Sequence, residues 1–455
     1  MSRIIRSASV ATLVAFTATG LATASEAATT PSDAGASYLA RQLAAGGHQL
    51  TSSYNGQSFP ATGLSADAIL ALDSSRTAAG EAAASRAVFD SAVKNYVGYG
   101  TDVYAGATAK ALITVLAGGQ DPKKATGIDL VASLKALENA QGRFADKSSY
   151  GDNSSTLTQS LAIIALKKAG QPVDQKAVTN LLSTKCADGG FATNLKNGAC
   201  VSDTDSTSFA VQALAAAGGQ PEAMGRAARH LIALQKADGG LAGGPAAPSE
   251  NANSTGLAAV AFAVSGHPAN AAKARSFVTS LQYGCSFPAA VRGGIAYDAA
   301  SYATMKKAGV NATVSDIDTR ATAQAELALT LTPYVSIVAG GTKDTPSIEC
   351  ATSPKPTPTS KPTPTTKPSS TSAPTTPAPS STSVSPTSST SATAAPTTTA
   401  PSASASSTSA TTPTAGAPGP VVNTDREASS PTLPTSLALA ALAATGGAVA
   451  FARRR

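Results

Sequence analysis

Two carboxylates stand one residue apart near the middle of the chain, in the run Asp203-Thr204-Asp205-Ser206-Thr207. A carboxylic acid can donate a proton to a reacting group as a general acid. Asp, Ser and Thr are also the residues that most often cap helix N-termini, because their side-chain oxygens accept a free backbone N–H. An alanine-rich apolar stretch follows the run, so the simpler interpretation is that these side chains cap a helix.

The chain has four cysteines and three histidines. In an exported protein, four cysteines can form two disulfides, with three possible pairings. Cys186 and Cys200 bracket one loop, so we expect them to pair, and Cys285 would then pair with Cys350. A zinc site is the alternative, but the chain lacks a Cys-x-x-Cys motif and its histidines lie far apart in sequence. The sequence therefore predicts no metal and no other cofactor.

The elements that position these residues repeat along the chain. Asp188-Gly189-Gly190-Phe191 and Asp238-Gly239-Gly240-Leu241 are two copies of a tight turn, in which glycines supply the positive φ angles. A capping segment and an apolar helix follow each turn, and the helix ends at a glycine. The glycines that end these helices, at intervals of 52, 48 and 48 residues, are Gly118, Gly170, Gly218 and Gly266. A fixed period of about fifty residues indicates a repeat architecture.

Weaker copies of this repeat unit flank the clear copies on both sides. Tyr38 to Leu72 is a first unit, with expected helix starts at Ser37 and Ser65. Ala271 to Leu331 is a last unit, with its turn at Gly293. No run shows the alternating pattern of a strand. The sequence thus predicts an all-α domain of six helix pairs.

The chain divides into four parts. Residues 1–27 have the order of a secretory signal peptide, with basic residues, an apolar stretch and a small-residue cleavage site. Residues 28–350 are the folded part, with 25 Lys and Arg against 24 Asp and Glu. The formal charge of +7 therefore arises mostly outside the folded part, and no basic stripe indicates nucleic-acid binding. Residues 351–432 are rich in Ser, Thr and Pro, which predicts a disordered stalk, with or without glycosylation.

The tail, residues 433–455, contains twenty mostly apolar residues followed by three arginines. Such a hydrophobic helix can just span a bilayer, and the arginines would keep the folded domain outside the cell. The tail also resembles a sortase cell-wall sorting signal of Gram-positive bacteria, through Leu442-Ala443-Ala444-Thr445-Gly446. That motif lies too close to the arginines for the usual hydrophobic span. We favour a membrane anchor and leave wall attachment open.

The repeat resembles the prenyltransferase/squalene-cyclase repeat, and Gln235-Lys-Ala-Asp238-Gly239-Gly240-Leu241 is its best copy. The resemblance covers residues 36–335. It implies a terpenoid cyclase-like α/α toroid, in which six inner helices are ringed by six outer ones. Terpene cyclases, protein prenyltransferases, thioester domains and cobalamin carriers share this architecture.

The residues argue against a catalytic role like that of the terpene cyclases, protein prenyltransferases or thioester domains. Terpene cyclases carry Asp-x-Asp-Asp-Thr, and the similar run here would make Asp205 the acid but places Ser206 where the third carboxylate belongs. The chain has no Trp and only 4 % aromatic residues, whereas a carbocation needs aromatic faces around it. The zinc ligands of prenyltransferases and the thioester motif are also missing.

The resemblance places the N-termini of all inner helices at one rim. The polar residues expected there, as ligand-binding candidates, are Asn153, Asp203, Asp205, Asn251, Asn253, Asp316 and Asp318, joined by Arg292 and Tyr297. Helix capping and solvation are the alternative for each of them. We therefore expect a surface-anchored extracellular protein that binds an unknown small molecule or surface ligand without catalysis. Cobalamin-type capture, a terpenoid-modifying enzyme and an adhesive scaffold remain alternatives.

Overall fold

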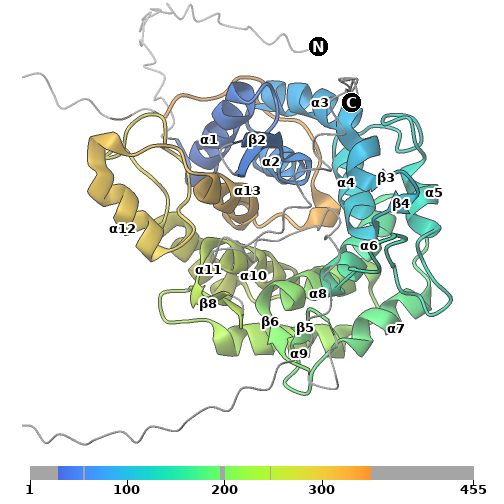
Figure 1. Ribbon diagram of the computed structural model, residues 1–455. Coiled ribbons are helices and arrows are strands. Elements are labelled where there is room, and N and C mark those ends of the chain that lie inside the picture. The colour runs from blue at the N-terminus through green and yellow to red at the C-terminus, as the bar shows by residue number, and fades with distance from the viewer. Residues whose placement is uncertain (1–28, 55–56, 195–199, 246, 349, 351–455) are drawn as a thin grey trace, which may run out of the picture. The chain divides into compact units, whose positions relative to one another are not determined.

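The computed structural model describes residues 29–54, 57–194, 200–245, 247–348 and 350, which form a ring of paired helices (Figure 1). The helices that line the ring are α2 (Thr62–Ser75), α4 (Ala105–Ala117), α6 (Thr156–Lys168), α8 (Thr204–Ala217), α10 (Ala252–Val264) and α13 (Asp316–Thr330). The helices outside them are α1 (Pro31–Ala45), α3 (Ala79–Val97), α5 (Leu130–Lys135), α7 (Gln175–Ser183), α9 (Pro221–Leu234) and α11 (Pro268–Ser280). One further helix, α12 (Ala299–Ala308), precedes α13.

Short antiparallel hairpins precede four of the inner helices. They are β1 (Thr51–Tyr54) with β2 (Gln57–Pro60), β3 (Gly98–Tyr99) with β4 (Asp102–Val103), β5 (Phe191–Ala192) with β6 (Ser202–Asp203), and β7 (Ala242–Gly244) with β8 (Ala247–Glu250). The sequence showed no strand pattern because these strands span only two to four residues.

The inner helices close into a ring. Each contacts the next inner helix along the chain, and α13 contacts α2. Figure 1 shows the outer helices around them, with α12 projecting to one side. The expected α/α toroid of six pairs is therefore confirmed, and α12 is an addition that the repeat pattern did not predict. The first pair also begins earlier than expected, because Thr30 caps α1 and α2 begins at Thr62.

The inner helices are buried on every face over most of their length. All residues from Thr156 to Leu166 in α6, and from Ala252 to Phe262 in α10, are buried. Small residues permit this packing: a Cβ at Gly256 in α10 would lie 2.9 Å from the Cα of Ala325 in α13. An outer helix such as α9 buries only one apolar stripe. Over these turns, the inner helices thus leave almost no side chain exposed on any face.

The glycine turns join each repeat to the next. Gly239 has a φ of +100°, and a Cβ there would lie 2.1 Å from the carbonyl oxygen of Lys273 in α11. Gly293 has a φ of +85°, and a Cβ there would lie 2.0 Å from the carbonyl oxygen of Ala34 in α1. The same contact therefore links the fifth repeat to the sixth and the sixth to the first.

A glutamine reinforces both of these joints. The Nε2 of Gln235 donates to the carbonyl oxygen of Asn270 in α11 at 3.0 Å. The Nε2 of Gln282 donates to the carbonyl oxygen of Pro31 in α1 at 2.8 Å. Each glutamine also bonds the glycine turn of its own repeat. Ring closure thus uses the same interactions as the internal joints.

After α13 the chain crosses the ring at the C-terminal ends of the inner helices. We call residues 332–343 the C-terminal strap. Its backbone forms hydrogen bonds with Gln212 of α8, Lys168 of α6 and Ala117 of α4. The ring centroid of Tyr334 in the strap lies 5.4 Å from that of Phe209. The strap therefore packs across this end of the ring.

Both predicted disulfides are present. Cys186, in the turn before β5, pairs with Cys200, just before β6, and Cys285 pairs with Cys350 at the end of the domain. Paired cysteines indicate an oxidising environment, in agreement with the expected export. The predicted signal peptide (1–27), stalk (351–432) and tail (433–455) lie outside the described residues. None of the helices within the described ranges has the length and apolar character that a membrane crossing requires.

Candidate functional site

The predicted rim acids and amides lie at the N-terminal ends of inner helices, and two of them are caps. The Oδ1 of Asp203 accepts the N–H of Ser206 at 2.9 Å, and the Oδ1 of Asn251 accepts the N–H of Ser254 at 2.9 Å. These oxygens satisfy the first turns of α8 and α10. Asp205 is not the cap of α8: it lies half-buried one residue inside the helix.

Asp318 connects the last turn to α13. Its Oδ2 accepts the hydroxyl hydrogen of Tyr283 at 2.8 Å, and its Oδ1 accepts the N–H of Tyr297 at 3.2 Å. Burial raises the pKa of Asp318, and the hydrogen bonds from Tyr283 and Tyr297 oppose that shift only in part. Asp318 thus ties the last glycine turn, through the backbone of Tyr297, to the first turn of α13.

The other predicted residues lie on separate segments of the chain. Asn253 is buried in the first turn of α10, whereas Asn153 and Asp316 are exposed before α6 and at the start of α13. The Nε of Arg292 donates to the carbonyl oxygen of Phe287 at 2.7 Å, within the loop after α11. The predicted set is spread over several helix starts and turns, and Asp203, Asn251 and Arg292 bond to the backbone of their own helices or loops.

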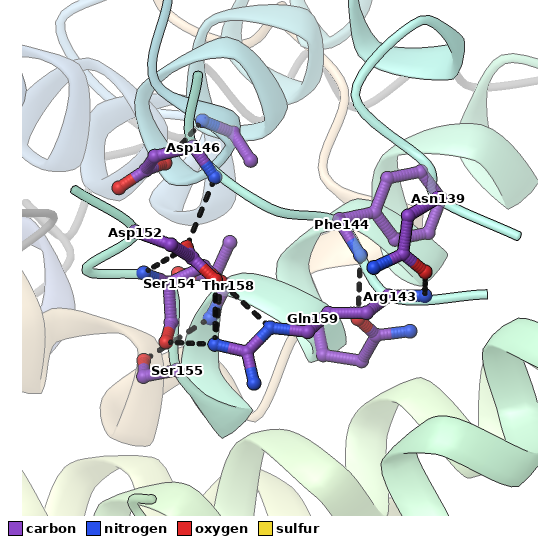
Figure 2. Close-up of polar contacts among 10 residues, drawn as sticks. Asn139, Arg143, Phe144, Asp146, Asp152, Ser154, Ser155, Thr158 and Gln159 are labelled. Carbon is purple, nitrogen blue, oxygen red and sulfur yellow. Dashed lines mark hydrogen bonds and ion pairs between the residues drawn. The ribbon is translucent and has the colours of Figure 1, made fainter. Parts of the chain in front are cut away.

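Hydrogen bonds and an ion pair also hold the loop before α6 in place (Figure 2). Arg143 pairs with the Oδ2 of Asp152 at 2.9 Å and donates to the Oγ of Ser154 at 2.9 Å. The Oδ1 of Asp146 accepts the N–H of Ala105 at 2.8 Å, so Asp146 caps α4 from the neighbouring repeat. Burial raises the pKa of Asp146, although the hydrogen bond from the Ala105 N–H partly lowers that pKa. These groups have protein partners and serve to position the rim.

A pocket of about 490 Å³ opens between the fourth and fifth repeats, and we call it the rim pocket. Its walls come from the turn after α7, from β6, from α9 and from the β7–β8 hairpin. The disulfide at Cys200 forms part of one wall. The volume falls in the range of small-molecule sites.

The rim pocket has polar walls and an apolar edge. Asp188, His230 and Glu250 supply its ionisable groups, together with Lys236. Val201 and Leu234 line the same pocket. The polar groups come from segments that the repeat places side by side, because β6 contacts β7. An amphipathic pocket of this kind can bind a small molecule and orient it.

A second, smaller pocket of about 290 Å³ lies between α3 and the C-terminal strap. Arg86 lines it and pairs with Asp73, the shortest N–O separation being 2.6 Å. Burial raises the pKa of Asp73, and the guanidinium of Arg86 opposes that rise. This pair is buried and also ties α2 to α3, which favours a structural role.

Sequence reasoning did not propose His230, Lys236 or Glu250 as site residues. They are separated in sequence from Asp188 and from one another, and only the fold brings them together. The repeat offered one signal for the rim pocket. In a toroid, the DGG turn of the fourth repeat and the segment after α9 must lie side by side. Within the described part of the chain, no three His, Cys, Asp or Glu side chains are positioned to hold a metal ion.

No family model and no curated protein matches the chain. Among solved structures, a protein from Actinoplanes is similar, with 17 % identity, a TM-score of 0.48, and coverage of 66 % of this chain and 98 % of that one. The apo type II terpene cyclase MstE from Scytonema is similar with 13 % identity and a TM-score of 0.47, covering 66 % of this chain and 96 % of that one. The unsaturated glucuronyl hydrolase from Bacillus sp. GL1 is similar with 14 % identity and a TM-score of 0.46, covering 68 % of this chain and 98 % of that one. Likenesses at these identities and TM-scores transfer no activity to this chain.

Proposed function

We propose that this protein is a surface-anchored extracellular binding protein that captures a ligand in the rim pocket and catalyses no reaction. The rim pocket is the observation that carries the proposal. It combines a volume of about 490 Å³, four ionisable side chains and an apolar edge on one side of the ring. A disulfide and two hairpins hold its walls, so little order has to be gained on binding.

The packing of the ring supports binding at the rim rather than chemistry in the centre. A substrate enclosed by the inner helices would need a chamber lined by accessible side chains. Instead α6 and α10 are buried on all faces over three turns. The Oδ1 of Asp203 caps α8, which supports a structural role for this first carboxylate of the run that resembles the cyclase motif.

Export supports an extracellular ligand. Two disulfides suit an oxidising compartment, and the signal peptide and apolar tail expected from the sequence suit attachment to the outer surface. In our proposal the tail enters the membrane, with sortase attachment as the alternative route. Deleting residues 433–455 should release the protein into the medium, and retention on the cell would contradict the anchor.

The experiment that tests ligand capture is native mass spectrometry of the protein purified from its own host. Val201→Trp should narrow the rim pocket, whereas Val310→Trp makes the same change at a valine that is 90 % exposed on the α12–α13 connection. We expect a retained mass in the wild type and in Val310→Trp, and a loss of at least about tenfold in occupancy in Val201→Trp. Equal retention in both variants would exclude the rim pocket as the site.

The burial of α6 and α10 favours one second candidate, a purely adhesive or spacing scaffold. Such a protein would need the ring surface but no pocket. If the wild type retains no mass and Val201→Trp leaves attachment of the protein to its surroundings unchanged, the scaffold becomes the better description.

A further inference from the structure

The rim pocket is built around an acidic side chain that the protein holds in place. The Oδ1 of Asp188 accepts the hydroxyl hydrogen of Ser202 at 2.6 Å and the N–H of Gly190 at 3.0 Å. Partial burial alone would raise the pKa of Asp188, but these hydrogen bonds and the nearby His230 outweigh it, so the pKa lies below its usual value. Asp188 is 53 % exposed and therefore remains accessible from the pocket.

A second carboxylate lines the same pocket. Glu250 ends β8 and is half-buried. Among the residues that the structure describes, Glu250 forms no ion pair. A carboxylate that lines a pocket and has no cationic partner there offers a negative charge that a cationic ligand can pair with.

His230 adds a second group with unused hydrogen-bonding capacity. Its side chain is only 10 % exposed, and its Nδ1 lies 3.6 Å from the Oδ2 of Asp188. Its Nε2 has no hydrogen-bond partner among the described residues. Gly190 leaves room for this ring, since a Cβ there would lie 2.7 Å from the Cδ2 of His230. The imidazole is thus packed into the wall beside Asp188.

The edge of the pocket is apolar. Val201 is 55 % exposed and Leu234 is 40 % exposed, and both line the opening. Exposed aliphatic side chains that gather at a pocket mark an apolar surface, and burying it in contact with a ligand is favourable. A ligand that fits both parts of the pocket has an apolar body and a cationic end.

We propose that the rim pocket binds a protonated amine carried on a short aliphatic chain. This inference rests on the proposed function, because it specifies the ligand of the same site. The ammonium group would sit between Asp188 and Glu250, and its alkyl chain would cover Val201 and Leu234. Charge-assisted hydrogen bonds to two carboxylates would fix the amine.

Lys236 provides a variant that should raise the affinity for an amine instead of lowering it. It is exposed and lines the same pocket, so it repels a cation that enters. Its long side chain can turn towards solvent. Replacing Lys236 by Gln should therefore strengthen binding of an amine, while replacing Glu250 by Gln should weaken it. Opposite effects from these two changes would not follow from a general loss of structure.

The probes are n-pentylamine, n-pentanol and pentanoate, which share one chain length and differ in charge. Titrations followed by two-dimensional amide NMR on the disulfide-intact protein would give the dissociation constants. We expect pentylamine to bind at least about tenfold more tightly than pentanol, and pentanoate more weakly than both. Glu250→Gln should weaken pentylamine by about tenfold, with pentanol unchanged.

Glu222→Gln is the matched control, because Glu222 lies on α9 outside the pocket and is 78 % exposed. It removes the same charge and should leave the affinity for pentylamine within about twofold of the wild type. Equal binding of pentylamine and pentanol, or equal effects of Glu250→Gln and Glu222→Gln, would overturn the inference. A host ligand that is retained in the pocket but lacks an amine would overturn only the inference, whereas failure of the Val201→Trp test would overturn the proposed function.

Discussion

The cap of α8 illustrates how one carboxylate can determine local order at the rim. The Oδ1 of Asp203 accepts both the N–H and the hydroxyl hydrogen of Ser206, at 2.9 and 2.7 Å. We expect Asp203→Ala to lower the free energy of unfolding by about 1 kcal/mol, and Asp203→Asn to change it by much less, because Asn caps as well as Asp. Urea unfolding of the two variants measures this. An asparagine variant as unstable as the alanine variant would show that the charge matters more than the cap.

Glu326 gives a second prediction at the scale of the residue. Its carboxyl group is fully buried in α13, its Oε1 accepts the hydroxyl hydrogen of Ser32 at 2.7 Å, and a Cβ at Gly35 would lie 2.0 Å from its Oε2. Burial raises the pKa of Glu326 well above the usual 4.5. The folded protein therefore keeps a proton that the unfolded chain loses above about pH 4.5, so stability falls with rising pH by at most about 1.4 kcal/mol per unit until the folded pKa is reached.

Glu326→Gln should remove this fall in stability with rising pH. We expect the variant to match the wild type below pH 4.5, the usual pKa of a glutamate, and to become progressively more stable than the wild type towards pH 7. Thermal melts across this range measure the gap. Glu222→Gln, at an exposed glutamate, is the control and should show no widening gap. A gap that is constant with pH would mean that Glu326 is ionised in the folded protein.

At the scale of elements, the disulfide between Cys186 and Cys200 joins the turn before β5 to the end of the β5–β6 connection. Its sequence separation is 14 residues, and closure of such a loop contributes about 3 kcal/mol. We expect Cys186→Ser/Cys200→Ser to lose about that much stability in urea unfolding without reductant. Ligand retention should also fall, because Cys200 lines the rim pocket. An unchanged unfolding midpoint would show that the loop is held by its other contacts.

The elements that follow from local chemistry were predictable from the sequence. The glycines that end the inner helices, the DGG turns and the capping residues are short-range signals, and both disulfides followed from cysteine positions. The segments that required distant partners were not predicted: α12 fits no repeat copy, and the C-terminal strap carries no motif of its own. The rim pocket was missed for the same reason, since Glu250 and His230 meet Asp188 only after the repeats have stacked.

At the scale of the whole molecule, closure distinguishes this ring from an open stack of repeats. In an open stack each repeat contacts only its neighbours and the ends fray. Here α13 packs against α2, and Gln282 bonds the first residue of α1. The first and last repeats therefore have neighbours on both sides, which predicts uniform stability around the ring.

Two matched glutamine variants test this closure. Gln235→Ala breaks the joint between the fifth and sixth repeats, and Gln282→Ala breaks the joint between the sixth and the first. Each removes two hydrogen bonds to backbone carbonyls, and Gln235→Ala also removes the bond that the Nδ2 of Asn270 donates to the Oε1 of Gln235. If the ring is closed in solution, both should lower the free energy of unfolding by a similar amount, about 1–3 kcal/mol. Hydrogen exchange should then quicken in α1 for Gln282→Ala and in α11 for Gln235→Ala. If Gln282→Ala is neutral while Gln235→Ala is destabilising, the ring is open at this joint, and the first and last repeats behave as free ends.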